Sequence, residues 1–253
     1  MAAITADSGF SIGRVIQRLV SALQANLGPF LLLSALLSGL PIFLSGCLQV
    51  LGQNPILAGL LGLVMLVFQL WGAFMLQATL IAGALSHFDE ERSSIGDWLS
   101  KGLAHWWRVL LVDLLSGLII GAAWLLFVVP GIMMATRYAV AVPAQISEGL
   151  RVNQSLARSA QLTSGRRWAI FGLFLLYFVP VLITEGLVVV TAVATSPGGF
   201  AGAVQSPIFR LLMLPLLNSG IALIAAVGLA ALYAELRIGR ESPTTLNVAK
   251  VFD

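Results

Sequence analysis

The chain has 253 residues, of which only 10% are charged and 58% belong to the apolar set AVILMFWYC. A soluble domain carries about 25% charged residues, so this composition excludes an ordinary water-soluble surface. The 14 Lys and Arg against 11 Asp and Glu give a net charge of only +3. Nucleic acid is therefore not an expected partner, because phosphate binding needs clustered Lys and Arg. No Pro/Gly/Ser-rich linker divides the apolar stretches, and a single domain, 1–253, is predicted.

A helix that crosses a bilayer needs about 20 predominantly apolar residues. Five stretches meet that length, and a shorter sixth lies between the third and the fourth, after the helix-breaking pair Pro130-Gly131. The predicted spans are residues 29–50, 56–85, 109–129, 132–146, 168–194 and 211–233. The pair Pro130-Gly131 predicts a tight outer turn, and Gly117 and Gly121 form a GxxxG pair that favours close helix packing in the third span. The sequence thus predicts an all-α integral membrane bundle of about six helices.

The distribution of Lys and Arg favours six spans over five. With six spans, all of them except Arg137 and Arg210 fall in connections or termini on one side, and the opposite connections carry none. Cytoplasmic loops are the ones enriched in Lys and Arg. Both termini are therefore predicted to be cytoplasmic.

Three amphipathic stretches precede the three pairs of spans, at residues 10–25, 94–107 and 151–164. Each places apolar residues on one helical face and basic or polar residues on another, which is typical of helices that lie in the headgroup plane. The tripeptide Ser11-Ile12-Gly13 recurs as Ser94-Ile95-Gly96. The chain can be interpreted as three units of interfacial helix plus hairpin, or simply as a membrane protein with amphipathic inner loops.

No motif in the sequence predicts catalysis, a metal site or a cofactor. The two histidines, His87 and His105, lack a metal-ligand spacing, and nucleophile-elbow, P-loop and dinucleotide motifs are absent. The single Cys47 excludes an internal disulfide. The segment Leu44-Ser45-Gly46-Cys47 has the form of a lipoprotein cleavage box, but it follows a long amphipathic stretch, and a buried membrane cysteine is the alternative.

Ionisable side chains within or beside the spans are the candidate site residues, because inserting a charge at a helix centre costs about 2.5 to 3.5 kcal/mol. Near the inner surface the candidates are Asp113, Glu148, Arg158 and Glu235; toward the outer leaflet they are Arg137, Glu185 and Arg210. They predict either a polar cavity or headgroup site, or charges that snorkel to the nearest interface. For Arg137, the expected anion is Glu185 or a lipid phosphate.

The central segments resemble a known family. The residues that carry the resemblance are Val129-Pro130-Gly131-Ile132, Arg137-Tyr138, Val142-Pro143-Ala144, Glu148-Gly149, Ala157-Arg158-Ser159, Leu162-Thr163-Ser164-Gly165-Arg166-Arg167-Trp168 and Tyr233-Ala234-Glu235-Leu236-Arg237. They resemble the membrane domain of the glycerophosphoryl diester phosphodiesterase family and the related YciC-like bacterial inner-membrane proteins. Some members carry a soluble phosphodiesterase barrel for which this chain has no room.

The resemblance implies a multi-pass protein of the bacterial inner membrane and no phosphodiesterase activity. The expected function is therefore non-enzymatic, with membrane lipids as partners. Another membrane protein or a second copy of the chain is a further candidate partner. A small transporter or channel subunit, with a polar path lined by Arg137, Glu185 and Arg210, is the alternative. An intramembrane enzyme is a third, which a close carboxylate pair with a metal would support.

Overall fold

The computed structural model describes residues 10–51 and 55–241. Every regular element in these two ranges is helical, with no strand, which confirms the predicted all-α class. The helices are α1 (Ile12–Ser34), η1 (Ala35–Gly39), α2 (Leu40–Leu51), α3 (Pro55–Phe88), α4 (Ile95–Leu126), α5 (Val128–Tyr138), α6 (Ala141–Glu148), α7 (Val152–Leu162), α8 (Arg167–Thr195), α9 (Gly199–Gln205), η2 (Phe209–Met213) and α10 (Leu214–Glu241).

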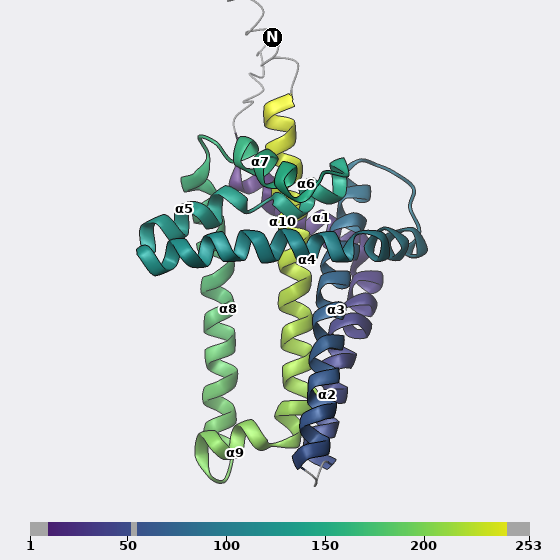
Figure 1. Cartoon of the computed structure of the whole chain (residues 1–253), viewed down its shortest axis with the longest axis vertical. Helices are drawn as coiled ribbons and strands as arrows, with labels where there is room; N and C mark the ends of the chain where they lie inside the picture. Colours follow the sequence, from purple (N-terminus) through teal and green to yellow (C-terminus); the bar gives the residue numbers. More distant parts are fainter. Residues whose placement is uncertain (1–9, 52–54, 242–253) are drawn as a thin grey trace, which may run out of the picture.

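Five helical stretches in the described part are long and apolar enough to cross a membrane. They are Ile12–Leu48, Gly59–Phe88, Ile95–Leu126, Arg167–Thr195 and Phe209–Glu241. Figure 1 shows α3, α8 and α10 running lengthwise with α2 beside α3, whereas α4 runs across their upper ends. The fold therefore has lengthwise apolar helices with a layer formed by α4, α5, α6 and α7 across one end.

A kink in α1 coincides with the first predicted boundary between an interfacial helix and a span. Asn26 departs from helical geometry inside α1, with φ of −128° and ψ of 24°. It separates the amphipathic stretch, whose Val15 and Ala22 are buried, from the apolar continuation that contains Pro29. The third predicted interfacial helix, 151–164, also appears as a separate helix, α7.

The second interfacial helix and the third predicted span form one continuous helix, α4, and this corrects the expected division at residue 108. Glycines allow α4 to cross α3 at close range. A Cβ at Gly102 would lie 2.1 Å from Thr79 Oγ1, and a Cβ at Gly83 would lie 2.9 Å from the Trp98 ring. Because neither glycine has a side chain, the two backbones approach closely, and α4 lies across α3.

The predicted turn at Pro130-Gly131 is displaced. The chain breaks at Phe127, whose extended backbone (φ −164°, ψ 159°) ends α4 and precedes α5. Pro130 instead falls in the first turn of α5. Backbone N–H groups in the first turn have no acceptor within the helix, so a proline there costs no hydrogen bond. Helix α5 then folds back on α4, since a Cβ at Gly131 would lie 2.6 Å from the Trp124 ring.

The predicted short span 132–146 is not a single helix. Helix α5 ends at Tyr138 and α6 begins at Ala141, with Val140 outside helical geometry (φ −111°, ψ 21°).

The GxxxG pair also has a different environment from the one expected, because nothing lies within 4 Å of a Cβ placed at Gly117 or Gly121. The middle unit of the proposed threefold repeat thus differs in shape from the other two.

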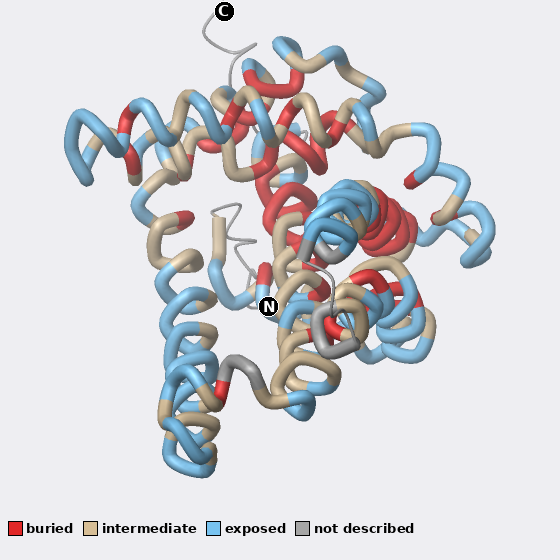
Figure 2. The backbone as a smooth tube through the Cα atoms, turned by 60° about the horizontal axis from the view of Figure 1, so that its bottom comes forward, coloured by how far each residue is buried: buried red, intermediate tan, exposed pale blue. Residues whose placement is uncertain are grey.

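The core lies at the end of the molecule where α1 begins and α10 ends. Figure 2 shows buried backbone concentrated there, whereas α8 is largely exposed. The last turns of α10 are almost wholly buried from Ala230 to Leu236, against residues of α3 and α6 such as Leu80 and Ala144. Of the residues of α8, only Ile170 is buried.

Candidate functional site

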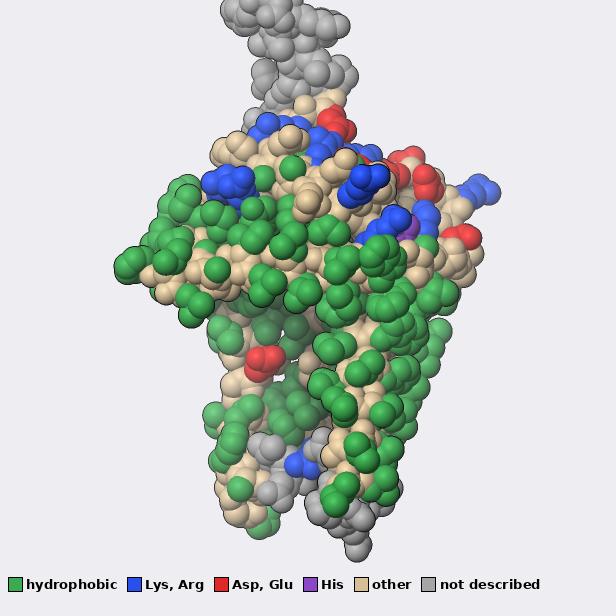
Figure 3. All heavy atoms as spheres, in the orientation of Figure 1, with side chains coloured by type: hydrophobic (Ala, Val, Ile, Leu, Met, Phe, Trp, Pro, Cys, Tyr) green, Lys and Arg blue, Asp and Glu red, His purple; other side chains and the backbone are tan. Residues whose placement is uncertain are grey.

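Charged side chains gather at one end of the molecule, as Figure 3 shows. We call this the charged end, formed by the start of α1, by α6 and α7, and by the last turns of α10. The start of α1 and the end of α10 meet there, so the helices at both ends of the chain reach the same face. The six-span prediction also placed both ends of the chain on one side, and the cytoplasmic location of that side stays a prediction.

Glu148 and Arg158, two predicted site residues, pair directly at this end. Arg158 Nε donates to the Glu148 carboxylate at 2.8 and 3.1 Å, and the Arg158 guanidinium also contacts Glu241. Tyr233 donates its hydroxyl to Glu148 Oε1 at 2.8 Å. Partial burial lowers the pKa of Arg158, but the two carboxylates outweigh it and the pKa is raised. The guanidinium is therefore held in its charged form.

Glu235, a third predicted site residue, is buried on α10 with 3% of its surface exposed. Arg14 Nε lies 2.6 Å from Glu235 Oε1, and Arg18 Nε lies 3.4 Å from Oε2. Two arginines of α1 thus neutralise one buried carboxylate of α10. An ionised carboxylate can be buried only when it is paired in this way.

Further contacts connect the end of α10 to its neighbours. Arg237 donates to Asp89 Oδ1 at 3.0 Å, at the end of α3, and to Ser147 Oγ of α6 at 3.2 Å. Arg240 donates to the Ser164 carbonyl at 2.9 Å, in the turn between α7 and α8. The charged end is therefore held together mainly by arginines.

Arg166 lies where the beginning of α8 meets α1 and α10. Its Nη2 donates to the Gly239 carbonyl at 3.3 Å, and its guanidinium lies 5.8 Å from the centre of the Phe10 ring. Its Nη1 is buried and has no hydrogen-bond partner among the described residues. Partial burial lowers the pKa of Arg166, and the nearby charges of Arg240 and Arg14 lower it further, against the opposing effect of Glu235.

Arg137 does not lie near the opposite face, where the six-span prediction placed it. Its carbonyl accepts hydrogen bonds from Ser159 Oγ at 2.9 Å and Thr163 Oγ1 at 3.2 Å, both on or beside α7. Because α5 folds back along α4, Arg137 stays in the layer at the charged end. The expected pairing with Glu185 is not among the ion pairs of the described residues, and the Arg137 side chain lies instead over the Tyr138 ring, 5.6 Å from its centre.

The other predicted site residues are dispersed. Glu185 is exposed on α8, about 27 Å along the helix from its first residue at 1.5 Å per residue. Arg210 lies in η2, at the end of the lengthwise helices away from the charged end. Asp113 of α4 is half-buried beside the Gln77 side chain of α3. The structure thus brings Glu148, Arg158 and Glu235 to one end, with Arg137 in the layer beside them, and leaves Glu185 and Arg210 away from that end.

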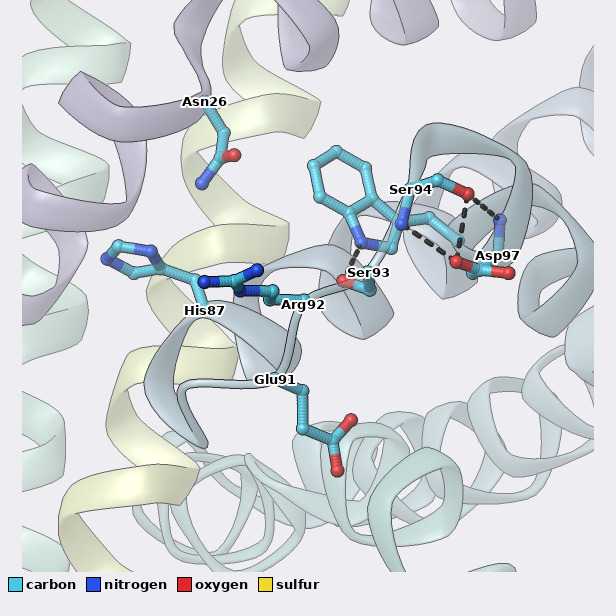
Figure 4. Close-up of a pocket in the computed structure, with 8 residues that line it drawn as sticks. Asn26, His87, Glu91, Arg92, Ser93, Ser94 and Asp97 are labelled. Carbon is cyan, nitrogen blue, oxygen red and sulfur yellow. Dashed lines mark hydrogen bonds between the residues drawn. The ribbon is translucent and has the colours of Figure 1, made fainter.

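A polar pocket of about 510 Å³ lies beside the kink in α1. Figure 4 shows Asn26 pointing toward His87 and Arg92, while the Glu91 side chain extends away. The remaining lining residues are Ser93, Ser94, Asp97 and Trp98. Most of these hold the turn before α4: Trp98 Nε1 donates to Ser93 Oγ at 2.7 Å, and the Ser94 hydroxyl and backbone N–H both donate to Asp97. Much of the pocket wall therefore consists of residues that hydrogen-bond one another to cap the beginning of α4.

The described residues contain no group of three or more His, Cys, Asp or Glu that could hold a metal ion. The carboxylates at the charged end are each paired with arginine, as shown above for Glu148 and Glu235. Nothing in this arrangement gathers a nucleophile with a base. The chemistry offered by the charged end is the binding of anions by guanidinium groups.

A hollow separates α8 from α10 below the crosswise α4, and it opens to the side of the molecule, as Figure 3 shows. Tyr177 of α8 bridges toward α10 by donating its hydroxyl to the Ile221 carbonyl at 3.1 Å. The sequence of both helices here is apolar, and Glu185 and Arg210 are the charged residues between 168 and 234. Apart from these two charges, the walls of the hollow are apolar and suited to hydrocarbon.

Sequence reasoning missed the partners that hold the site together. Arg14, Arg18 and Tyr233 contact the predicted carboxylates, yet Arg14 and Glu235 are 221 positions apart in the chain. In the sequence, Arg14 and Arg18 stand out only because they share one face of an amphipathic helix. That pattern predicts an interfacial helix, but it does not predict that the arginines pair with a buried carboxylate.

The fold defines an all-α membrane protein with a charged end and a laterally open apolar hollow. Comparison of the chain with models of known families, with curated proteins and with solved structures gave no match.

Proposed function

We propose that this protein is a non-enzymatic membrane protein whose function is to bind phospholipid, with an acyl chain lying in the hollow between α8 and α10. The observation that carries the proposal is the separation of α8 from the rest of the molecule. The apolar window of α8 has no buried residue, and the hollow beside it opens sideways. Within a bilayer such a space fills with hydrocarbon, because an empty apolar void loses the dispersion contacts of its walls.

The proposal places the protein in a bacterial inner membrane with the charged end in the cytoplasm. The excess of arginines at that end supports this orientation through the positive-inside bias. The resemblance of residues 129–168 and 233–237 to the glycerophosphoryl diester phosphodiesterase membrane domain family supports the bacterial assignment. Two of the family-like residues, Glu148 and Arg158, form a direct ion pair at 2.8 Å.

The alternative, a transporter or channel subunit, would need a polar path closed to lipid. Arg137, Glu185 and Arg210, the residues expected to line such a path, lie in the end layer, on α8 and in η2 respectively. The hollow is open toward the lipid phase, and its walls are apolar apart from the charges of Glu185 and Arg210. These features favour a lipid in the hollow over an ion or solute path.

The test is to fill the hollow and measure bound phospholipid. Thr184 lies seven residues after Tyr177, hence on the same face of α8, which Tyr177 directs toward α10. Thr184→Trp should lower the phospholipid that remains with the purified protein, measured by native mass spectrometry. Leu182→Trp, which adds the same ring to another face of the helix, is the matched control. Equal phospholipid in both variants and the wild type would contradict the proposal.

A further inference from the structure

The surplus of arginine over carboxylate is concentrated where α1, α8 and α10 meet. Arg14 and Arg18 share Glu235, and Arg166 and Arg240 lie close enough to influence one another's charge. Four guanidinium groups therefore lie around this junction, and two of them share the one buried carboxylate. Because an isolated cation in a partly buried place is costly, such a cluster favours a bound anion.

Arg166 forms no ion pair with a carboxylate of the described residues, although Glu235 is near enough to act on its charge. Nη2 donates to the Gly239 carbonyl, a neutral acceptor, and Nη1 is a buried donor without a partner in the described residues. The guanidinium reaches this position because residue 239 is glycine: a Cβ there would lie 2.7 Å from Arg166 Nη1. A buried donor without a partner costs about 1–3 kcal/mol, and more when it is charged.

The same junction closes the charged end of the hollow. Arg166 and Arg240 join the beginning of α8 to the end of α10 through the Gly239 and Ser164 carbonyls. Trp168, at the second residue of α8, is 84% exposed. Exposed tryptophans beside arginine mark the level of lipid headgroups in membrane proteins. The arginine cluster thus lies at headgroup depth, above the space proposed for an acyl chain.

We propose that this cluster, Arg14, Arg18, Arg166 and Arg240, binds the phosphate of an anionic phospholipid whose acyl chain enters the hollow between α8 and α10. The inference rests on the proposed lipid binding and adds a selectivity for negatively charged headgroups. Phosphate suits this site because its oxygens accept several guanidinium hydrogen bonds at once. The beginning of α8 adds the partial positive charge of a helix N-terminus.

The experiment uses the full chain, stripped of lipid in detergent and given equal amounts of phosphatidylglycerol and phosphatidylcholine. Native mass spectrometry then measures the ratio of the two bound lipids. The wild type should prefer phosphatidylglycerol, and Arg166→Gln should reduce that preference about fivefold, which corresponds to about 1 kcal/mol per arginine. Arg151→Gln, the same change at an exposed arginine of the charged end, should leave the ratio unchanged. Arg166→Lys keeps the charge and should retain most of the preference.

Each contrary result has a distinct meaning. Phospholipid bound in the wild type without any headgroup preference, or the same loss in Arg166→Gln and Arg151→Gln, overturns the anionic site and leaves the proposed function standing. No bound phospholipid of either kind overturns both. If inorganic phosphate alone displaces phosphatidylglycerol at millimolar concentration, the site binds a free anion and the lipid assignment is wrong. If Arg166→Gln lowers the yield, Arg240→Gln should reduce the preference in the same way.

Discussion

Arg14 Nε and Glu235 Oε1 lie 2.6 Å apart and connect the first helix of the chain to the last. The carboxylate is buried, whereas 41% of the arginine side chain is exposed. Arg18, on the next turn of α1, faces the other oxygen of the same carboxylate. Removing the arginines would leave a buried negative charge without a partner, whereas removing the carboxylate would leave positive charges that are partly exposed to solvent. The two kinds of substitution should therefore differ in their cost to stability.

The double variant Arg14→Ala, Arg18→Ala should therefore lower stability by about 3 kcal/mol, since an unpaired buried charge remains. Glu235→Gln should cost less, and adding Glu235→Gln to the double variant should recover much of the loss. Thermal unfolding in detergent, followed by circular dichroism, measures the differences. An additive triple variant would contradict a direct pairing of these groups.

Tyr233→Phe should destabilise the charged end by about 1 kcal/mol, because the Glu148 carboxylate loses a hydrogen bond from a mostly buried hydroxyl. Tyr138→Phe is the matched control, because Tyr138 contacts Arg137 through its ring. The measurement is the change in unfolding midpoint temperature of each variant relative to the wild type. Equal shifts would show that the hydroxyl of Tyr233 contributes little to holding Glu148.

Gly131→Ala should be more damaging than Gly117→Ala. A Cβ at Gly131 would meet three atoms of the Trp124 ring between 2.6 and 2.8 Å, whereas nothing lies within 4 Å at Gly117. Overpacking of this kind costs about 1–3 kcal/mol. The yield of folded protein and the unfolding midpoint are the measurements, and Trp124→Ala should relieve the effect of Gly131→Ala. If Trp124→Ala gives no relief, α5 does not pack on α4 through this glycine.

The helices themselves were largely predictable because their signals are local. The break at Asn26, the separate helix α7 and the long apolar helices α3, α8 and α10 follow from apolar periodicity, polar interruptions and length. Membrane insertion likewise follows from composition. Those features depend on residues close together in the chain.

The arrangement of the helices was less predictable because it depends on contacts between distant residues. The crosswise direction of α4 depends on Gly102 meeting Thr79 and on Gly83 meeting Trp98. An apolar stretch of about 20 residues is long enough for a span whether its helix runs lengthwise or across the others. Hydropathy therefore could not distinguish a lengthwise α4 from a crosswise one. The expected position of Arg137 depended on the six-span division of the chain. For Glu148 and Glu235, the location at the inner membrane surface stays a prediction.

The sharpest test of the arrangement joins Val140, in the connection between α5 and α6, to α7 by a disulfide. The Val140 amide donates to Ser159 Oγ at 3.2 Å, and both residues are fully buried. The six-span prediction instead puts residue 140 within the membrane and residue 159 on its inner surface. In a Cys47→Ser background, Val140→Cys with Ser159→Cys should form a crosslink under a membrane-permeable oxidant, detected as a linked peptide by mass spectrometry. Disulfide formation requires Cα atoms within about 7 Å, so it reports direct proximity.

The control for this crosslink is Val140→Cys with Phe200→Cys, because Phe200 lies in α9 at the opposite end of α8 and is 64% exposed. This pair should stay reduced under the same oxidant. Absence of a crosslink between positions 140 and 159, in protein whose thiols are shown to be reactive after unfolding, would restore the separate span 132–146. It would also return Arg137 to the membrane interior and remove the layer that closes the hollow at the charged end.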